Sequence, residues 1–138
     1  MGSDTLGKKI MIIEDEYDLL LLFKDFLTNK GYDVIVTAVT ATNITRDYQS
    51  FKPDLTILDY KLPGGKNGLE AAQEILKLDS KALIILITAY EYVKDYFYEN
   101  GKLHNRIRLV MKPIKLNTLE KFIASLLKNK WFLFVSRL

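Results

Sequence analysis

Short apolar runs alternate along the chain with segments in which apolar residues recur every three or four positions. The runs are rich in β-branched residues, as buried parallel strands are, and the spaced segments have the period of amphipathic helices. Strands alternating with helices indicate repeated βα units and a parallel sheet. Strands are predicted at 10–13, 33–39, 55–58, 82–89 and 106–111, and helices at 17–30, 41–51, 69–78, 91–100 and 116–127.

Right-handed crossover connections leave few ways to order five parallel strands. We predict an α/β fold, a doubly wound five-stranded parallel sheet of order 2-1-3-4-5 with five helices. The first and third strands are then neighbours, about 4.8 Å apart, at the point where the strand order reverses. Ligands bind such sheets beyond the carboxyl ends of the strands, so the residues that follow each strand are the candidates for function.

The composition is that of one globular domain. The chain has 138 residues, 49% of them hydrophobic, and no apolar run is long enough to span a bilayer. It has no cysteine, which excludes disulfides and thiolate metal sites, and no signal-like amino terminus. We therefore expect a cytoplasmic protein with no membrane partner. Residues 1–7 lack periodicity and are predicted to be a flexible arm or a cloning remnant.

A net charge of +3 could indicate an anionic partner such as nucleic acid. The lysines are spread along the chain, however, and Lys8 and Lys9 form the only Lys/Arg doublet. No strand pattern of aromatic and basic residues and no recognition-helix signature stands out. We predict no direct nucleic-acid contact by this domain, and a surface position for the sole histidine, His104.

Polar side chains that could bind ligands or take part in a reaction lie at the ends of four of the predicted strands. Because the carboxyl ends of parallel strands share one edge of the sheet, three carboxylates there would repel one another and raise at least one pKa. A cation must complete such a site, and oxygen ligands without His or Cys suit Mg²⁺. The residues are Glu14 and Asp15 after the first strand, Asp59 after the third, Thr88 on the fourth and Lys112 after the fifth.

Each of these residues also has an ordinary structural interpretation. Acids such as Glu14 and Asp15 favour the first turn of a helix, and Asp59 could form the turn before a Pro-Gly loop. Thr88 could cap a helix and Lys112 could be a surface charge. Four independent coincidences at one edge of a sheet are far less expected than any one of them.

The ordered set of Glu14-Asp15, Asp59, Thr88-Ala89 and Lys112-Pro113 resembles the receiver domain of two-component response regulators. The resemblance covers residues 8 to about 129, and it is specific because each motif follows its own apolar run in the family's order. It implies a flavodoxin-like fold and a receiver domain at 8–129.

The resemblance implies a role for each residue at the site. Asp59 would be the nucleophile that accepts a phosphoryl group, and three groups would bind the phosphoryl oxygens: the Thr88 hydroxyl, the Ala89 backbone N–H and the Lys112 amine. A cis peptide bond before Pro113 would turn the lysine over the crevice.

The resemblance also implies a magnesium site. Asp15 would bind Mg²⁺ directly and Glu14 mainly through water, while Asp59 and the backbone carbonyl of Lys61 would supply further oxygens. The remaining coordination position would receive the incoming phosphoryl group.

A phosphorylation-dependent signalling switch is the function that follows from the resemblance. The phosphoryl group would come from a histidine kinase or phosphotransfer protein. The altered surface would then contact a downstream output domain or protein, and homodimer formation stays open. Such a protein is a phosphoacceptor that assists its own phosphorylation and dephosphorylation, not an enzyme with a separate substrate.

Two alternatives use the same residues. A Mg²⁺-dependent phosphatase or phosphotransferase would usually carry a second acid two residues after the nucleophile, where this chain has Lys61, and would need a cap that so short a chain lacks. A pseudo-receiver would bind partners without phosphorylation, which the presence of Asp59, Thr88 and Lys112 disfavours.

Three features depart from the family pattern. Asn67 stands where glycine is usual and Gly68 follows one residue late, which predicts a one-residue insertion. Leu109 replaces the aromatic residue that often couples to the threonine. Residues 130–138 are apolar and continue the spacing of the last helix, which predicts either a longer helix or a strand-like segment. Because leucine has no ring hydroxyl, the expected reporters of phosphorylation are Tyr90, Tyr92 and Tyr96.

Overall fold

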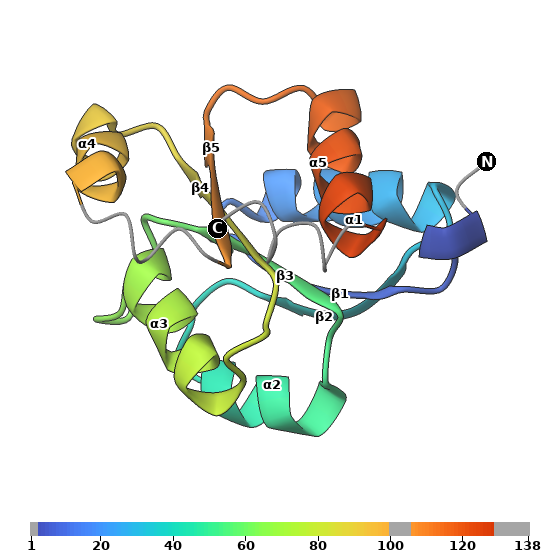
Figure 1. Cartoon of the computed structure of the whole chain (residues 1–138), viewed down its shortest axis with the longest axis horizontal. Coiled ribbons are helices and arrows are strands. Elements are labelled where there is room, and N and C mark those ends of the chain that lie inside the picture. Colours follow the sequence, from blue (N-terminus) through green and yellow to red (C-terminus); the bar gives the residue numbers. More distant parts are fainter. Residues whose placement is uncertain (1–2, 100–105, 129–138) are drawn as a thin grey trace, which may run out of the picture.

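The computed structural model describes residues 3–99 and 106–128 as a single parallel sheet flanked by helices (Figure 1). Its five strands lie in the order β2-β1-β3-β4-β5, which confirms the predicted topology. The elements are η1 (Ser3–Thr5), β1 (Lys9–Ile13), α1 (Tyr17–Asn29), β2 (Asp33–Ala38), α2 (Ile44–Phe51), β3 (Leu55–Asp59), α3 (Gly68–Leu78), β4 (Ile84–Thr88), α4 (Glu91–Glu99), β5 (Ile107–Met111) and α5 (Leu116–Lys128).

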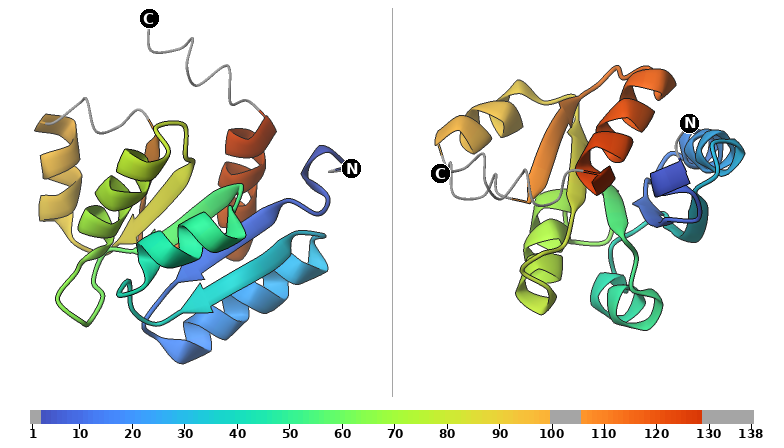
Figure 2. Two further views of the ribbon diagram at one scale, coloured as in Figure 1. Left: turned by 90° about the horizontal axis from the view of Figure 1, so that it is seen from below. Right: turned by 45° about the vertical axis from the view of Figure 1, so that its right-hand side comes forward.

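Helices cover both faces of the sheet (Figure 2). Successive side chains of a strand point to opposite faces, so β1 contributes to two separate cores. Ile10 and Ile12 pack with α1 and α5, whereas Met11 and Ile13 pack with α2, α3 and α4. Because both faces are covered, the central strands are apolar throughout, and this explains why their sequences show continuous runs rather than alternation.

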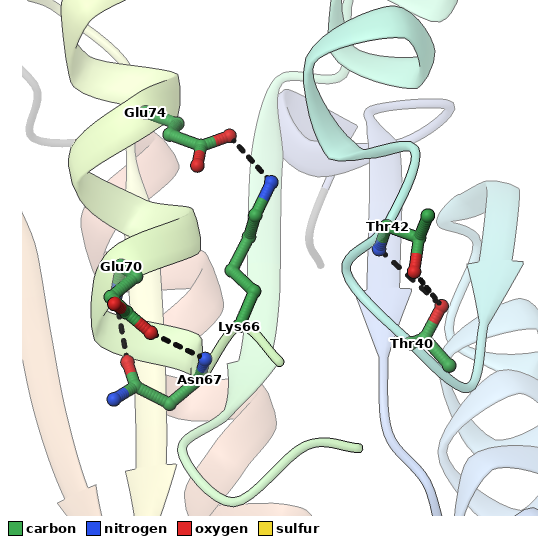
Figure 3. A network of polar contacts seen from close by, with 6 residues as sticks. All are labelled: Thr40, Thr42, Lys66, Asn67, Glu70 and Glu74. Carbon is green, nitrogen blue, oxygen red and sulfur yellow. Dashed lines mark hydrogen bonds and ion pairs between the residues drawn. The ribbon is translucent and has the colours of Figure 1, made fainter. Parts of the chain in front are cut away.

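The helices begin and end close to the predicted positions, with one informative difference. The second helix begins at Ile44 rather than at residue 41. The preceding residues form a tight turn in which the Thr42 backbone N–H donates to Thr40 Oγ1 at 3.3 Å (Figure 3). Threonine side chains bind nearby backbone groups in this way and so compete with helix formation.

Within the predicted arm, Thr5 packs against the domain, whereas Asp4, Leu6 and Gly7 are exposed. Thr5 is only 4% exposed, and η1 contacts α5. The Gly7 backbone N–H donates to the Gly31 carbonyl at 2.8 Å, just after α1 ends. Burial of Thr5 and this long-range bond hold the segment against the domain, and neither leaves a periodic signal in the sequence.

Some of the predictions concern residues outside the described part of the chain. These are His104, the last residue of the predicted fourth helix at 100, and the tail at 130–138. Within residues 3–99 and 106–128, no helix is long and apolar enough to cross a membrane.

Candidate functional site

The carboxyl ends of four strands bring the predicted residues to one edge of the sheet. Asp59 is the last residue of β3 and Thr88 the last of β4. Glu14 follows β1 directly, and its backbone N–H donates to the Ala38 carbonyl at 3.0 Å. Lys112 follows β5, and its backbone N–H donates to the Thr88 carbonyl at 2.8 Å. Backbone pairing therefore fixes the position from which each of these side chains departs.

Three carboxylates meet at this edge. One oxygen each from Glu14, Asp15 and Asp59 lies within 4.8 Å of the others. Glu14 is 1% exposed and Asp59 5% exposed, whereas Asp15 faces solvent. All three donors are hard oxygens, and the spacing suits a divalent cation such as Mg²⁺, which takes one or two carboxylates and keeps several waters. The donor set fits the predicted magnesium ion.

Lys112 supplies the positive charge of the site. Its Nζ lies 3.5 Å from Asp59 Oδ2, 3.7 Å from Glu14 Oε1 and 3.9 Å from Glu16 Oε1. The peptide bond between Lys112 and Pro113 is cis, as the resemblance implied. A half-buried ammonium beside two buried carboxylates offsets part of their mutual repulsion.

Burial dominates the ionisation of the two inner acids. The pKa of Glu14 is raised to about 7, chiefly by burial and also by the nearby Asp59 charge, while the Glu16 backbone N–H and Lys112 act in the opposite direction. Burial also raises the pKa of Asp59, although Lys112 acts in the opposite direction. A proton held on Glu14 therefore relieves repulsion in the cluster until a cation takes its place.

Thr88 and Ala89, at the end of β4, differ in their exposure to solvent. The Thr88 side chain is buried, and its Oγ1 accepts a hydrogen bond of 3.0 Å from the Tyr90 backbone N–H. Ala89 is exposed and lines a hollow of about 430 Å³ that also includes Lys112 and Glu16. Lys61 is exposed in the loop after β3.

Gly68 shows why the loop after Asp59 needs a glycine at its end. A side-chain carbon added at Gly68 would lie 2.2 Å from the Asp59 carbonyl oxygen, which no residue with a Cβ could tolerate without a shift. Its backbone N–H donates to the Tyr60 carbonyl at 2.7 Å. Asn67, the preceding residue, caps α3: its side chain accepts from the Glu70 backbone N–H, and Glu70 accepts from the Asn67 backbone N–H (Figure 3). Gly68, which follows one residue later than in the family pattern, is therefore the residue that allows the close approach to the Asp59 carbonyl.

A family model described as the response regulator receiver domain matches residues 10–124. The chain belongs to this family. The match covers all five strands and most of α5, and so includes every strand end at the site.

Relatives of this receiver domain include chemotaxis and sporulation proteins. The chemotaxis protein CheY of Thermotoga maritima is 33% identical over 84 residues, which are 61% of this chain and 69% of the relative. Sporulation initiation phosphotransferase F of Bacillus subtilis is 30% identical over 87 residues, or 62% of this chain and 67% of the relative. A CheY-like receiver domain protein from Methanospirillum hungatei superposes with a TM-score of 0.78 at 25% identity, covering 90% of this chain and 96% of that one.

Glu16 is a residue of the site that the sequence pattern did not single out. Its backbone N–H donates to Glu14 Oε2 at 3.1 Å, and its own carboxylate lies in the Lys112 ion-pair cluster. Its position two residues after Glu14, just before α1, was the available signal, because the free backbone N–H groups at a helix start can bind a nearby carboxylate such as that of Glu14. Glu16 orients the Glu14 carboxylate and competes for the lysine.

Proposed function

We propose that this receiver domain is a phosphorylation-dependent switch in which Asp59 accepts a phosphoryl group from a histidine kinase or phosphotransfer protein. The observation that carries the proposal is the placement of the buried Asp59 carboxylate 3.5 Å from the Lys112 ammonium, within a cluster of three acids. Asp15 is exposed and Glu14 is tied to the Glu16 backbone, so Asp59 is the acid best placed at the centre of the group.

In the proposed reaction an Asp59 carboxylate oxygen attacks phosphorus while the phosphorus–nitrogen bond to the donor histidine breaks. The imidazole leaves as the neutral ring, because its other ring nitrogen carries a proton in the phosphorylated donor. Lys112 donates to one phosphoryl oxygen, and Thr88 and the Ala89 backbone N–H donate to others. Hydrolysis by water later releases inorganic phosphate and restores the Asp59 carboxylate. Transfer of this kind depends on positioning and charge neutralisation more than on acid–base chemistry.

Receiver domains typically bind Mg²⁺, and the acid cluster fits that ion. Asp15, Asp59 and the Lys61 carbonyl would hold it, with Glu14 acting through water. When bound, the ion would neutralise negative charge on the phosphoryl group. The chain's own contribution is the fixed placement of these oxygens by the ends of β1 and β3.

The partners follow from the same proposal. A kinase or phosphotransfer protein would deliver the phosphoryl group, and a downstream protein or output domain would recognise the altered surface. The mycobacterial relative MtrA is a DNA-binding response regulator, and the matched residues make up 47% of its length. A homodimer remains a further arrangement to test.

Intact-mass spectrometry with Mg²⁺ and acetyl phosphate tests the assignment of Asp59. The parent chain is expected to gain one phosphoryl mass, and Asp59→Asn to gain none, because the amide is not nucleophilic. Asp25→Asn, which removes an exposed acid from α1, is the control and should be phosphorylated at the parent rate. Uptake by Asp59→Asn at a rate near that of the parent would show that another residue is the acceptor.

A further inference from the structure

A second hollow, separate from the acid cluster, lies between α3 and α4, which are neighbours on the same face of the sheet (Figure 2). Its volume is about 490 Å³. Tyr60, Tyr92 and Tyr96 provide aromatic walls, and Leu69 and Val93 provide apolar surface. Aromatic rings and short aliphatic side chains together make a site for a side chain with a flat or apolar body.

The tyrosine rings hold one another in defined orientations. Tyr60 meets Tyr92 edge-on, with ring centres 6.2 Å apart and planes at 82°. Tyr90 stacks on Tyr92, with ring centres 5.2 Å apart and planes at 27°. Tyr92 nevertheless remains 60% exposed and Tyr96 41% exposed, so large ring surfaces face the hollow and solvent. The face of an aromatic ring is electrostatically negative and attracts cations.

Two acids and no basic residue line this hollow among residues 3–99 and 106–128. Asp95 and Glu99 are both lining residues and stand four positions apart on α4, a spacing at which like charges repel. Glu99 is the last residue of α4, whose final turn has no basic residue, and a helix carboxyl end already carries partial negative charge. Lys94, which precedes Asp95 in sequence, pairs with Glu91 at 3.2 Å.

We propose that this hollow between α3 and α4 binds an arginine side chain presented by a partner protein. The guanidinium group is planar, weakly hydrated and able to stack on tyrosine while donating to a carboxylate, so it fits better than the compact, strongly hydrated lysine ammonium. Leu69 and Val93 would contact its methylene stem. The attraction of Asp95 and Glu99 for the cation would replace their mutual repulsion.

This binding site adds to the proposed phosphotransfer and does not depend on it. Tyr60 directly follows Asp59, yet its ring belongs to the hollow and its backbone N–H pairs with the Ile87 carbonyl at 2.8 Å. The hollow is formed without a phosphoryl group on Asp59, so arginine binding can be tested with the unphosphorylated chain.

Amide NMR of the full chain, titrated with acetyl-arginine amide, tests the site directly. We expect saturable shifts at residues 60, 69 and 92–99, and none of comparable size with acetyl-citrulline amide, which keeps the shape of arginine but lacks its charge. Equal shifts with citrulline, shifts centred elsewhere, or no saturable shift at tens of millimolar arginine amide would each overturn the proposal.

Matched variants separate the two contributions to binding. Tyr92→Leu and Asp95→Asn should each weaken the arginine complex about fivefold, by loss of an aromatic face and of a carboxylate. Tyr98→Leu removes a 77% exposed tyrosine of α4 that does not line the hollow, and Asp25→Asn removes an exposed acid of α1. Both controls should leave the affinity unchanged. Parent-like affinity in Tyr92→Leu and Asp95→Asn would also reject the site.

Discussion

At the scale of single residues, the site works by burying charge where neighbours only partly offset the cost. Glu14 is almost fully buried beside Asp59, and its pKa is raised to about 7, chiefly by burial. Lys112 lies 3.7 Å from it and Glu16 donates a backbone hydrogen bond, but these do not cancel the effect of burial. The metal-free protein therefore stores unfavourable electrostatic energy at the place where a cation is expected.

The first prediction concerns pH. A carboxyl whose pKa is raised on folding contributes stability that is fully present below its unfolded pKa, near 4.5, and is lost as pH rises through about 7. Glu14→Gln removes this titration, so its free energy of unfolding relative to the parent should rise by on the order of 2 kcal/mol between pH 5 and pH 8. Urea unfolding with a chelator present would measure it.

Asp25→Asn is the charge control for this measurement, because it removes an exposed acid of α1. Its stability relative to the parent should change little between the two pH values. If the free energy of unfolding of Glu14→Gln differed from that of the parent by the same amount at pH 5 and at pH 8, the pKa of Glu14 would not be raised in the folded protein.

A second prediction at this scale compares two glycines of the loop after β3. Gly68→Ala places a carbon against the Asp59 carbonyl and should lower the free energy of unfolding by about 2–3 kcal/mol. Gly65→Ala meets no atom within 4 Å, but its φ of +83° disfavours alanine, so a loss of about 1 kcal/mol is expected. Denaturant unfolding of both variants measures the two losses. If Gly65→Ala lowered the free energy of unfolding as much as Gly68→Ala, the contact of residue 68 with the Asp59 carbonyl would not explain the effect.

At the scale of elements, the helices that flank the site differ in how they begin. Asn67 and Glu70 form a reciprocal capping box at the start of α3 (Figure 3). Asn43 precedes α2 in the corresponding position, but its side chain makes no capping hydrogen bond. Only the first of these asparagines is therefore expected to stabilise its helix through the side chain.

Alanine substitution of the two asparagines tests this difference. Asn67→Ala should lower the free energy of unfolding by about 1 kcal/mol, because the Glu70 backbone N–H at the start of α3 loses its side-chain acceptor. Asn43→Ala should cost less than about 0.5 kcal/mol. Thermal or denaturant unfolding of both variants in one buffer gives the comparison, and equal losses would contradict the capping role of Asn67.

At the scale of the whole molecule, the acid cluster and the tyrosines are joined by short steps. Tyr90 donates its backbone N–H to Thr88 Oγ1, and its ring lies 5.2 Å from Tyr92 and 6.2 Å from Tyr60. Leu109 is partly buried on β5 and has no polar group to exchange between two positions. A signal that begins at Thr88 therefore has its shortest path through the tyrosines rather than through Leu109.

Hydrogen exchange with and without beryllofluoride would follow this path. If the Thr88 hydroxyl turns toward a phosphoryl oxygen, the Tyr90 N–H loses its acceptor, and the loop and α4 should reorder. We expect changed amide exchange at residues 88–99 and along β5, on the face formed by α4, β5 and α5. Changes confined to the neighbourhood of Glu14, Asp59 and Lys112 would contradict this route.

The sequence by itself determined the sheet and the identity of the strand ends. Apolar runs of this kind form buried strands, and crossover handedness leaves few orders for them. The pattern, together with the family resemblance of the strand ends, therefore predicted the sheet order and the shared edge of Glu14, Asp59, Thr88 and Lys112. The sequence also marked Gly68 as a glycine one residue later than the family pattern, whereas its close approach to the Asp59 carbonyl is visible only in the structure.

Only the tertiary structure determined the features that depend on distances between side chains far apart in the chain. The reach of Lys112 to Glu16, the packing of Thr5, and the hollow between α3 and α4 each require the final positions of two or more elements. The raised pKa of Glu14 belongs to the same class, since burial and the Asp59 charge exist only in the folded protein. Periodicity records which face of an element is buried, but it does not record what the element meets there.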